Sequence, residues 1–207
     1  MRKIGQGLQF NVYEKGDKVV KTPTSKFQIK LKLFLWTPSY LLKPSMLEKE
    51  TERIIKEREE VLQEIQKRKI EPSLMANLIF RENEIEQDKL IPLGQYLKDY
   101  ETAKEKIDEY ISFIFNCWKN GFSERTYNLT INNGINSDGE IVLMDFGEIT
   151  FRKSDVERAI KIKRWRKSWS FKRDMKKEIR DYYDKQMLER LTFSNLNKYW
   201  KEAPTHN

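Results

Sequence analysis

The sequence predicts an α+β fold in two lobes, in which a small antiparallel β-sheet lobe with one long helix precedes a mainly helical lobe. Three observations lead to this prediction. Short strand-type runs separated by turn residues occupy 2–22. Apolar residues then recur at helical spacing over 45–69 and 103–120. One strand–turn–strand pattern, at 135–150, lies within the otherwise helical second half.

The first 42 residues contain a strand region and a mixed segment. Val12 belongs to one strand, the Lys-Gly-Asp sequence at 15–17 suits a turn, and 19–21 suit a second strand. Residues 26–42 combine apolar and basic side chains, and a proline interrupts them. A small antiparallel meander is therefore expected, followed by a segment of undefined structure.

A long helix and two strands complete the first lobe, which is predicted over 1–88. The helix is predicted over 45–69, directly after Pro44, because apolar residues recur among many Glu and Lys, at Leu47, Ile54, Val61 and Ile65. The two strands are predicted at 74–80 and 83–91.

The second lobe, predicted over 89–207, is mainly helical. A short helix at 95–100 precedes the clearest helix of the sequence, at 103–120, which ends at an Asn-Gly pair. Its apolar stripe consists of Ile107, Tyr110, Ile111, Ile114 and Trp118. A loop, a hairpin and a mostly helical segment follow, at 122–130, 135–150 and 154–202.

Composition excludes several classes of protein. The 207 residues include one cysteine, Cys117, and one histidine, His206, so an intramolecular disulfide is impossible and a Cys/His zinc site implausible. Without an internal histidine as base, Ser-His-Asp and Cys-His catalysis are excluded too. The N-terminus lacks an apolar signal core, and no apolar run approaches the roughly 18 residues of a membrane span. A cytoplasmic protein with no transmembrane segment is expected.

Two stretches of the first lobe suit a phosphate site. Gly5 and Gly7, with Val12 following on a strand, suit a hairpin whose backbone approaches phosphates without an intervening Cβ. An ordinary tight turn would give the same pattern. Lys21 follows two valines, so its ammonium group would need phosphate or a helix carboxylate as partner if it is buried. An edge-strand lysine facing water is the alternative.

In the second lobe, the apolar run 141–144 ends on Asp145, which begins an Asp-Phe-Gly sequence. Together with GQGLQFNV at 5–12 and VVK at 19–21, this sequence resembles the motifs of the protein-kinase-like superfamily, in the correct order. The chain is similar to a compact prokaryotic-type member or a pseudokinase over roughly residues 2–150. Phe10 replaces the third glycine of the loop.

The resemblance implies a kinase-like protein that binds ATP and magnesium (Mg2+). Lys21 would orient the α- and β-phosphates, with Glu57 of the long helix preferred over Glu50 as its ion-pair partner. Residues 85–97 resemble the hinge that borders the adenine. The nucleotide-binding residues implied in this way are Gly5, Gly7, Val12, Lys21, Glu57, Glu86 and Gln87.

The catalytic loop both matches and departs from the family pattern. Asp145 and Asn133 correspond to the two magnesium ligands, but the catalytic aspartate corresponds to Asn128. An amide cannot accept the proton of a substrate hydroxyl, so the usual base is missing. Glu124 is the nearest carboxylate and could take its place. Asn128 and Glu124 are therefore the candidate catalytic residues.

The chain after Asp-Phe-Gly is short and strongly basic. It has no Ala-Pro-Glu sequence and only about sixty residues, which argues against the usual peptide-docking groove and leaves a small molecule or an unidentified protein as substrate. Between Arg152 and Arg180, thirteen Lys/Arg face four Asp/Glu. Trp165 and Trp169, four residues apart, would share a helix face. Residues 161–180 could therefore meet an anionic partner, either nucleic acid or a membrane surface, or the tryptophans could pack on the lobe.

Three functions remain open at this stage. The first is an ATP- and magnesium-binding, kinase-like phosphotransferase of unknown substrate. The second is a pseudokinase that senses nucleotide or serves as a scaffold. The third is a nucleic-acid-binding protein that uses its basic C-terminal helices.

Overall fold

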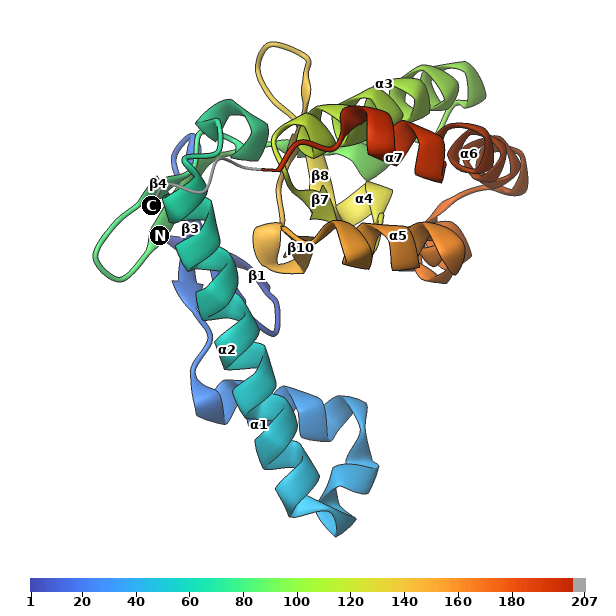
Figure 1. Cartoon of the computed structure of the whole chain (residues 1–207). Coiled ribbons are helices and arrows are strands. Elements are labelled where there is room, and N and C mark those ends of the chain that lie inside the picture. The colour runs from blue at the N-terminus through green and yellow to red at the C-terminus, as the bar shows by residue number, and fades with distance from the viewer. Residues whose placement is uncertain (203–207) are drawn as a thin grey trace. The chain divides into compact units, whose positions relative to one another are not determined.

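The computed structural model describes residues 1–202, the side chain of Leu41 excepted, so His206 lies outside the described part (Figure 1). The chain is an α+β fold with antiparallel sheets and helices. It divides into two compact units. Unit 1 comprises 1–67 and 77–89, and unit 2 comprises 68–76 and the chain from residue 90 on. The sequence did not anticipate that 68–76 would group with the second half of the chain.

The strands of unit 1 are β1 (Arg2–Gln6), β2 (Phe10–Lys15), β3 (Lys18–Pro23), β4 (Ile79–Phe80) and β5 (Ile85–Asp88). They form one antiparallel sheet in the order β1-β2-β3-β5-β4. The first three strands form the predicted meander. The turn between β2 and β3 contains Gly16, whose φ of 65° lies in the left-handed region that glycine adopts without strain.

The strands predicted at 74–80 and 83–91 are too long. Residues Pro72–Met75 form the 3-10 helix η2, which buries Leu74 and Met75. Ala76 and Asn77 then take left-handed backbone angles, which end that helix and leave only β4 extended. The apolar residues of this stretch are therefore buried by a helical turn rather than by a strand.

Three helices accompany the sheet of unit 1: α1 (Lys26–Trp36), η1 (Pro38–Leu42) and α2 (Pro44–Arg68). Helix α1 occupies the segment for which the sequence predicted no regular structure. Ser25 and Gln28 form a capping box at its start, each side chain accepting a hydrogen bond from the other's backbone N–H (3.3 and 3.2 Å). Ile29 and Leu33 of α1 then pack against Ile54 of α2.

Helix α3 (Tyr100–Lys119) is the longest helix of unit 2 among the described residues. The predicted apolar stripe is confirmed, because all five of its residues are buried. The helix begins earlier than predicted, because the side chain of Asp99 accepts a hydrogen bond from the backbone N–H of Thr102 (2.9 Å) and caps it.

Short strands position the loops of unit 2. In one sheet, β8 (Asn133–Ile135) pairs antiparallel with both β6 (Ile91–Pro92) and β9 (Ile141–Leu143). In another, β7 (Ser123–Glu124) pairs with β10 (Ile149–Thr150). The predicted hairpin at 135–150 is therefore β8 and β9, followed by the 3-10 helix η4 (Phe146–Glu148) and the separate strand β10.

The short helix predicted at 95–100 is the 3-10 helix η3 (Leu93–Tyr96). The remaining helices of unit 2 are α4 (Leu129–Asn132), α5 (Lys153–Lys161), η5 (Arg164–Lys167), η6 (Ser170–Asp174), α6 (Lys177–Arg190) and α7 (Phe193–Tyr199). The segment predicted as mostly helical over 154–202 is interrupted after α5, where Lys163 adopts a left-handed conformation. Across residues 1–202, no helix is long and apolar enough to cross a membrane.

Gly134 of β8 has no room for a side chain. A Cβ at this position would lie 2.7 Å from Leu90 Cβ and 3.0 Å from the Ile91 carbonyl oxygen. We expect Gly134→Ala to lower the free energy of unfolding by about 1–3 kcal/mol, measured by urea denaturation, because backbone must shift to relieve the overlap. Gly5→Ala is the matched control, since its Cβ would meet Val12 at an ordinary 3.6 Å. Equal losses in the two variants would contradict the packing argument.

Candidate functional site

The loop that precedes β8 is built around the carboxylate of Glu124, which is 6% exposed. Five donors surround it. Oε1 accepts hydrogen bonds from Thr126 Oγ1 (3.2 Å), Asn132 Nδ2 (2.8 Å) and the backbone N–H of Asn128. Oε2 accepts from the Tyr110 hydroxyl (3.0 Å) and Asn133 Nδ2 (3.1 Å). This single side chain therefore links α3 to most of the loop predicted to be catalytic.

Burial raises the pKa of Glu124, although hydrogen bonds from Asn133, Asn128 and Asn132 act in the opposite direction. The neighbouring carboxylate of Glu148 also raises this pKa. Asn132 Nδ2 donates to Glu148 Oε2 (3.1 Å) as well as to Glu124, so one amide lies between the two carboxylates. An enclosed, fully bonded carboxylate suits an anchor of the loop better than a base that must meet a substrate.

Asn128, one of the two candidate catalytic residues, is 8% exposed and bonded within the protein. Its Oδ1 accepts from the backbone N–H of Ser170 (3.0 Å) and from the Ser170 hydroxyl. Ser170 Oγ in turn accepts from the backbone N–H of Thr130 (2.9 Å). Asn128 thus ties the loop to η6. Sequence reasoning missed Ser170, because nothing in the Trp-Ser-Phe sequence around it indicates a contact forty-two residues away.

Backbone hydrogen bonds hold the two predicted magnesium ligands on adjoining segments. Asn133 pairs with Leu143 across β8 and β9, and the N–H of Asp145 donates to the carbonyl of Asn132 (3.0 Å). Asp145 is half-buried, and its Oδ1 accepts from the N–H of Gly147 (3.0 Å). Asn133 is fully buried, and its Oδ1 has no hydrogen-bond partner within the described part of the chain. An unpaired buried acceptor is uncommon in folded proteins, so Asn133 Oδ1 stands out among the buried polar atoms of the described residues.

Asp145 and Asn133 supply oxygen atoms of the kind that magnesium prefers. Magnesium prefers oxygen ligands and is often held by one or two protein groups plus phosphates and water, rather than by a complete protein cage. The carboxylate of Asp145 and the amide oxygen of Asn133 are ligands of this kind. No group of three or more His, Cys, Asp or Glu side chains within residues 1–202 could hold a metal ion without such help.

In unit 1, the glycine-rich turn between β1 and β2 is closed by a hydrogen bond from the Gly7 N–H to the Phe10 carbonyl (2.8 Å). Gly5 pairs with Val12 across the two strands. Lys32 of α1 donates from Nζ to the Gln6 carbonyl (3.0 Å) and the Gly7 carbonyl (2.5 Å). A helix that the sequence did not predict therefore supports this turn.

Arg58 of α2 is a second support that sequence reasoning missed. It is 8% exposed, and its Nη1 donates to the carbonyls of Gln9 (3.2 Å) and Thr24 (3.0 Å). Nothing in the sequence indicates that Arg58 is buried, since one arginine among the many charged residues of this helix carries no such signal. Arg58 fixes the start of β2 and the end of β3 relative to α2.

Lys21 lies on an interior strand of the sheet rather than at an edge. It pairs with Val12 of β2 on one side and Ile85 of β5 on the other, and it is 5% exposed. The alternative of an edge-strand lysine facing water is therefore wrong. On β5, Gln87 is buried opposite Val19 and Glu86 is half-buried opposite Val20.

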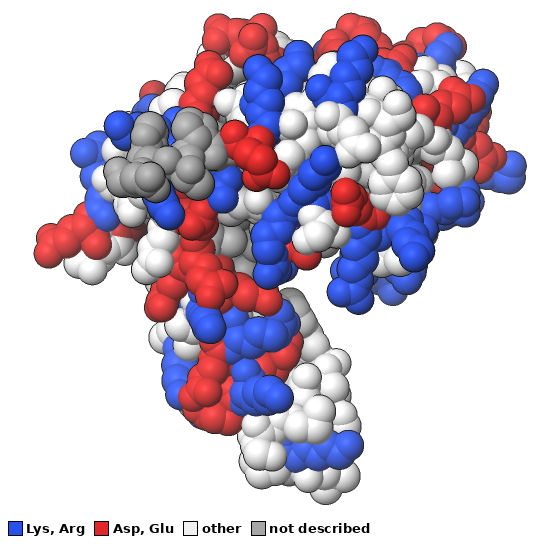
Figure 2. Space-filling model, in the orientation of Figure 1, with Lys and Arg blue, Asp and Glu red and all other residues white. Residues whose placement is uncertain are grey.

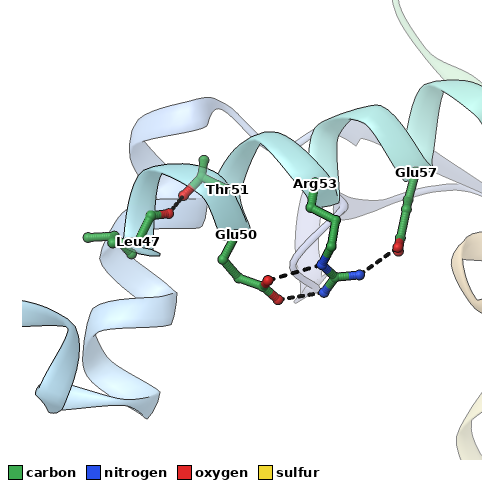
Figure 3. A network of polar contacts seen from close by, with 5 residues as sticks. All are labelled: Leu47, Glu50, Thr51, Arg53 and Glu57. Carbon is green, nitrogen blue, oxygen red and sulfur yellow. Dashed lines mark hydrogen bonds and ion pairs between the residues drawn. The ribbon is translucent and has the colours of Figure 1, made fainter. Parts of the chain in front are cut away.

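Both glutamates considered as partners of Lys21 bind Arg53 on α2 (Figure 3). Arg53 donates to Glu50 through Nε (3.0 Å) and Nη2 (2.5 Å), and to Glu57 Oε1 through Nη1 (2.5 Å). The hydrogen bond from Arg53 holds the pKa of Glu50 below its usual value. Arg53 thus fixes both carboxylates along one side of the helix.

The expectation that Trp165 and Trp169 share a helix face is wrong. Trp165 is buried in η5, where its Nε1 donates to Asp184 Oδ1 (2.8 Å). Trp169 is 51% exposed, and the Arg173 guanidinium lies 3.9 Å from its ring centroid. Ser168, which lies between the two tryptophans, has an extended backbone that ends η5, so the two residues do not belong to one helix and a spacing of four no longer means one face. The basic residues themselves stay at the surface, where Figure 2 shows Lys and Arg gathered around α5 and the short helices after it.

No family model and no curated protein matches this chain.

Proposed function

We propose that this protein binds magnesium and ATP in a kinase-like manner. The observation that carries the proposal is the unpaired, buried Oδ1 of Asn133, held by β8 and β9 on the segment adjoining Asp145. In unit 2, these two residues would hold the metal, which neutralises phosphate charge when bound. In unit 1, Lys21 would orient the α- and β-phosphates and the Gly5–Gly7 turn would cover them, with Val12, Glu86 and Gln87 near the base. Such a protein would act in the cytoplasm, where ATP and magnesium are present.

A specific observation favours the pseudokinase form of this proposal. Asn128 is not a base and is bonded to Ser170, while Glu124 is enclosed by five donors. No carboxylate of the loop is thus presented for proton transfer. Because phosphoryl transfer depends mainly on positioning and charge, slow turnover remains compatible with the site. We therefore propose nucleotide binding as the main function, serving as a sensor or scaffold.

Thermal unfolding with and without Mg-ATP tests the binding proposal. Ligand at about one hundred times its Kd stabilises by about 2.7 kcal/mol, which corresponds to a rise in Tm of roughly 5–10 °C for a chain of this size. Asp145→Ala should abolish most of that rise. Asp138→Ala, an exposed carboxylate in the β8–β9 turn, is the matched control and should keep it. No shift in the native protein, or equal shifts in all three proteins, would refute the proposal.

Turnover separates enzyme from pseudokinase once binding is established. The rate of ADP formation by the native protein is compared with that of Lys21→Met. Equal background rates establish the pseudokinase, whereas a native rate well above the variant establishes a phosphotransferase.

A further inference from the structure

An extended apolar surface lies on the helical part of unit 1, away from the sheet. Six large apolar side chains there are between 47% and 86% exposed: Phe27, Leu31, Leu35, Trp36, Leu42 and Met46. They come from α1, η1 and the first turn of α2, and together they are called the outer apolar face. Figure 2 shows a mostly uncharged surface at this end of unit 1, the lower end of the view. Monomeric soluble proteins rarely expose a contiguous patch of this kind without a use for it.

Helix α1 is apolar on two sides. Its inner side, with Ile29 and Leu33, is covered by α2. Phe27, Leu31 and Leu35 follow at intervals of four, so they form one stripe on its other side, which no described residue buries. A helix that is apolar all round is normally enclosed, either in a protein core or in lipid. The outer side of α1 therefore requires a covering partner.

The charge around this face indicates what that partner is. Residues 26–46 contain four lysines and no acidic residue. Lys26 and Lys30 both form ion pairs with Glu48 of α2, and Lys32 binds the glycine-rich turn. Lys43 is exposed, between the exposed side chains of Leu42 and Met46. Glu48 and Glu52 (3.4 Å from Lys26) thus offset part of this charge, and Lys43, which forms no ion pair among the described residues, carries the remaining positive charge beside the apolar face.

This combination matches the chemistry of an anionic lipid surface. Interfacial helices present Trp, Phe and Leu to the acyl boundary and Lys to the lipid headgroups. A second copy of the chain fits less well, because a two-fold contact would bring together two identical apolar faces that each carry the exposed Lys43. We propose that the outer apolar face of unit 1 docks on the surface of a bilayer that contains anionic lipids. This inference does not depend on nucleotide binding.

Vesicle flotation tests the proposal with the full chain. We expect the protein to float with vesicles of phosphatidylcholine containing about one third phosphatidylserine, and to float much less with vesicles of phosphatidylcholine alone. The reason is that lysine beside the apolar face is attracted by the anionic headgroups. Leu35→Glu and, independently, Phe27→Glu should lower the partition coefficient roughly tenfold or more, because each loses a large buried apolar contact. Phe193→Glu is the matched control: Phe193 is an exposed aromatic residue of α7 (49%) outside the outer apolar face, and this variant should float like the native protein.

Three outcomes would overturn the proposal. Absence of flotation on anionic vesicles is the first. Equal flotation of the native protein and both α1 variants is the second, because binding would then reside in other basic residues. The third is a concentration-dependent dimer in sedimentation analysis that Leu35→Glu and Phe27→Glu abolish while lipid binding is absent, since a second copy would then be what covers the face. Circular dichroism melting of each variant checks that its fold is intact.

Discussion

Replacing Glu124 with alanine is expected to lower the free energy of unfolding by about 3–5 kcal/mol, the range in which loss of a buried polar network falls. The substitution removes the acceptor of five donors and leaves the Tyr110 hydroxyl and the amides of Asn132 and Asn133 buried without it. Each buried donor left unsatisfied costs about 1–3 kcal/mol. Urea denaturation followed by circular dichroism measures the change.

Glu140→Ala is the matched control for this result. Glu140 is exposed in the β8–β9 turn, where its side chain accepts one hydrogen bond, from Asn136 Nδ2 (3.2 Å). Its loss should change stability by less than about 0.5 kcal/mol, as is usual for surface positions. If Glu124→Ala were equally mild, the donors around Glu124 would have other partners and the carboxylate would not be the anchor of the loop.

The raised pKa of Glu124 gives this residue a pH signature of defined sign. The folded state binds the proton more tightly than the unfolded chain, whose carboxyl has its ordinary pKa of 4.5. The stability that the protonated group contributes is therefore complete below about pH 4.5 and is lost as the pH rises through the folded-state pKa. The Gln side chain of Glu124→Gln does not titrate. The unfolding free energy of the native protein minus that of the variant should therefore fall as the pH rises from about 4.5 through the folded-state pKa of Glu124. A difference that rises with pH would contradict the assignment.

Trp165→Ala is expected to destabilise the protein by about 3–5 kcal/mol, the usual cost of removing a large aromatic side chain from a core. Trp165 is 1% exposed, its indole N–H donates to Asp184, and its ring meets Tyr127 edge-on at a centroid distance of 6.5 Å. The substitution would leave a cavity and remove one donor to Asp184, whose carboxylate would keep its two hydrogen bonds from Arg166 (2.7 and 2.6 Å). Thermal or urea unfolding measures the loss.

Trp169→Ala provides the contrast within the same basic segment. Because Trp169 is half exposed, its removal should cost less than about 1 kcal/mol of stability. Equal destabilisation by both variants would mean that Trp165 is not a core residue.

The same variant, Trp169→Ala, tests the nucleic-acid-binding function. If bases stack on Trp169, its removal weakens oligonucleotide binding. If binding is purely electrostatic, removal of Trp169 leaves the affinity unchanged, and the affinity falls as the salt concentration rises.

The sequence predicted part of the fold. Turn and strand-type residues predicted a meander over 2–22, where β1, β2 and β3 lie, and the apolar stripe of α3 was predicted residue by residue. The failures share a cause. Helix α1 is apolar on two sides and so lacks the one-sided pattern on which helix prediction depends, while η2 buries Leu74 and Met75 in a run that reads equally well as a strand. Periodicity cannot tell helix from strand in these two segments, because the elements that cover them are distant in the sequence.

In the candidate site, too, some features follow from the sequence and others only from the folded structure. The sequence by itself determined which chemical groups are available: an Asp-Phe-Gly carboxylate at Asp145, an asparagine at 133, a strand lysine at 21, and an amide in place of an acid at 128. Only the tertiary structure decided that Glu124 is enclosed, that Ser170 holds Asn128, and that Asn133 keeps a buried oxygen without a partner. The physical reason is that the type of a side chain is local, whereas its burial and hydrogen-bond partners depend on segments that only folding brings together.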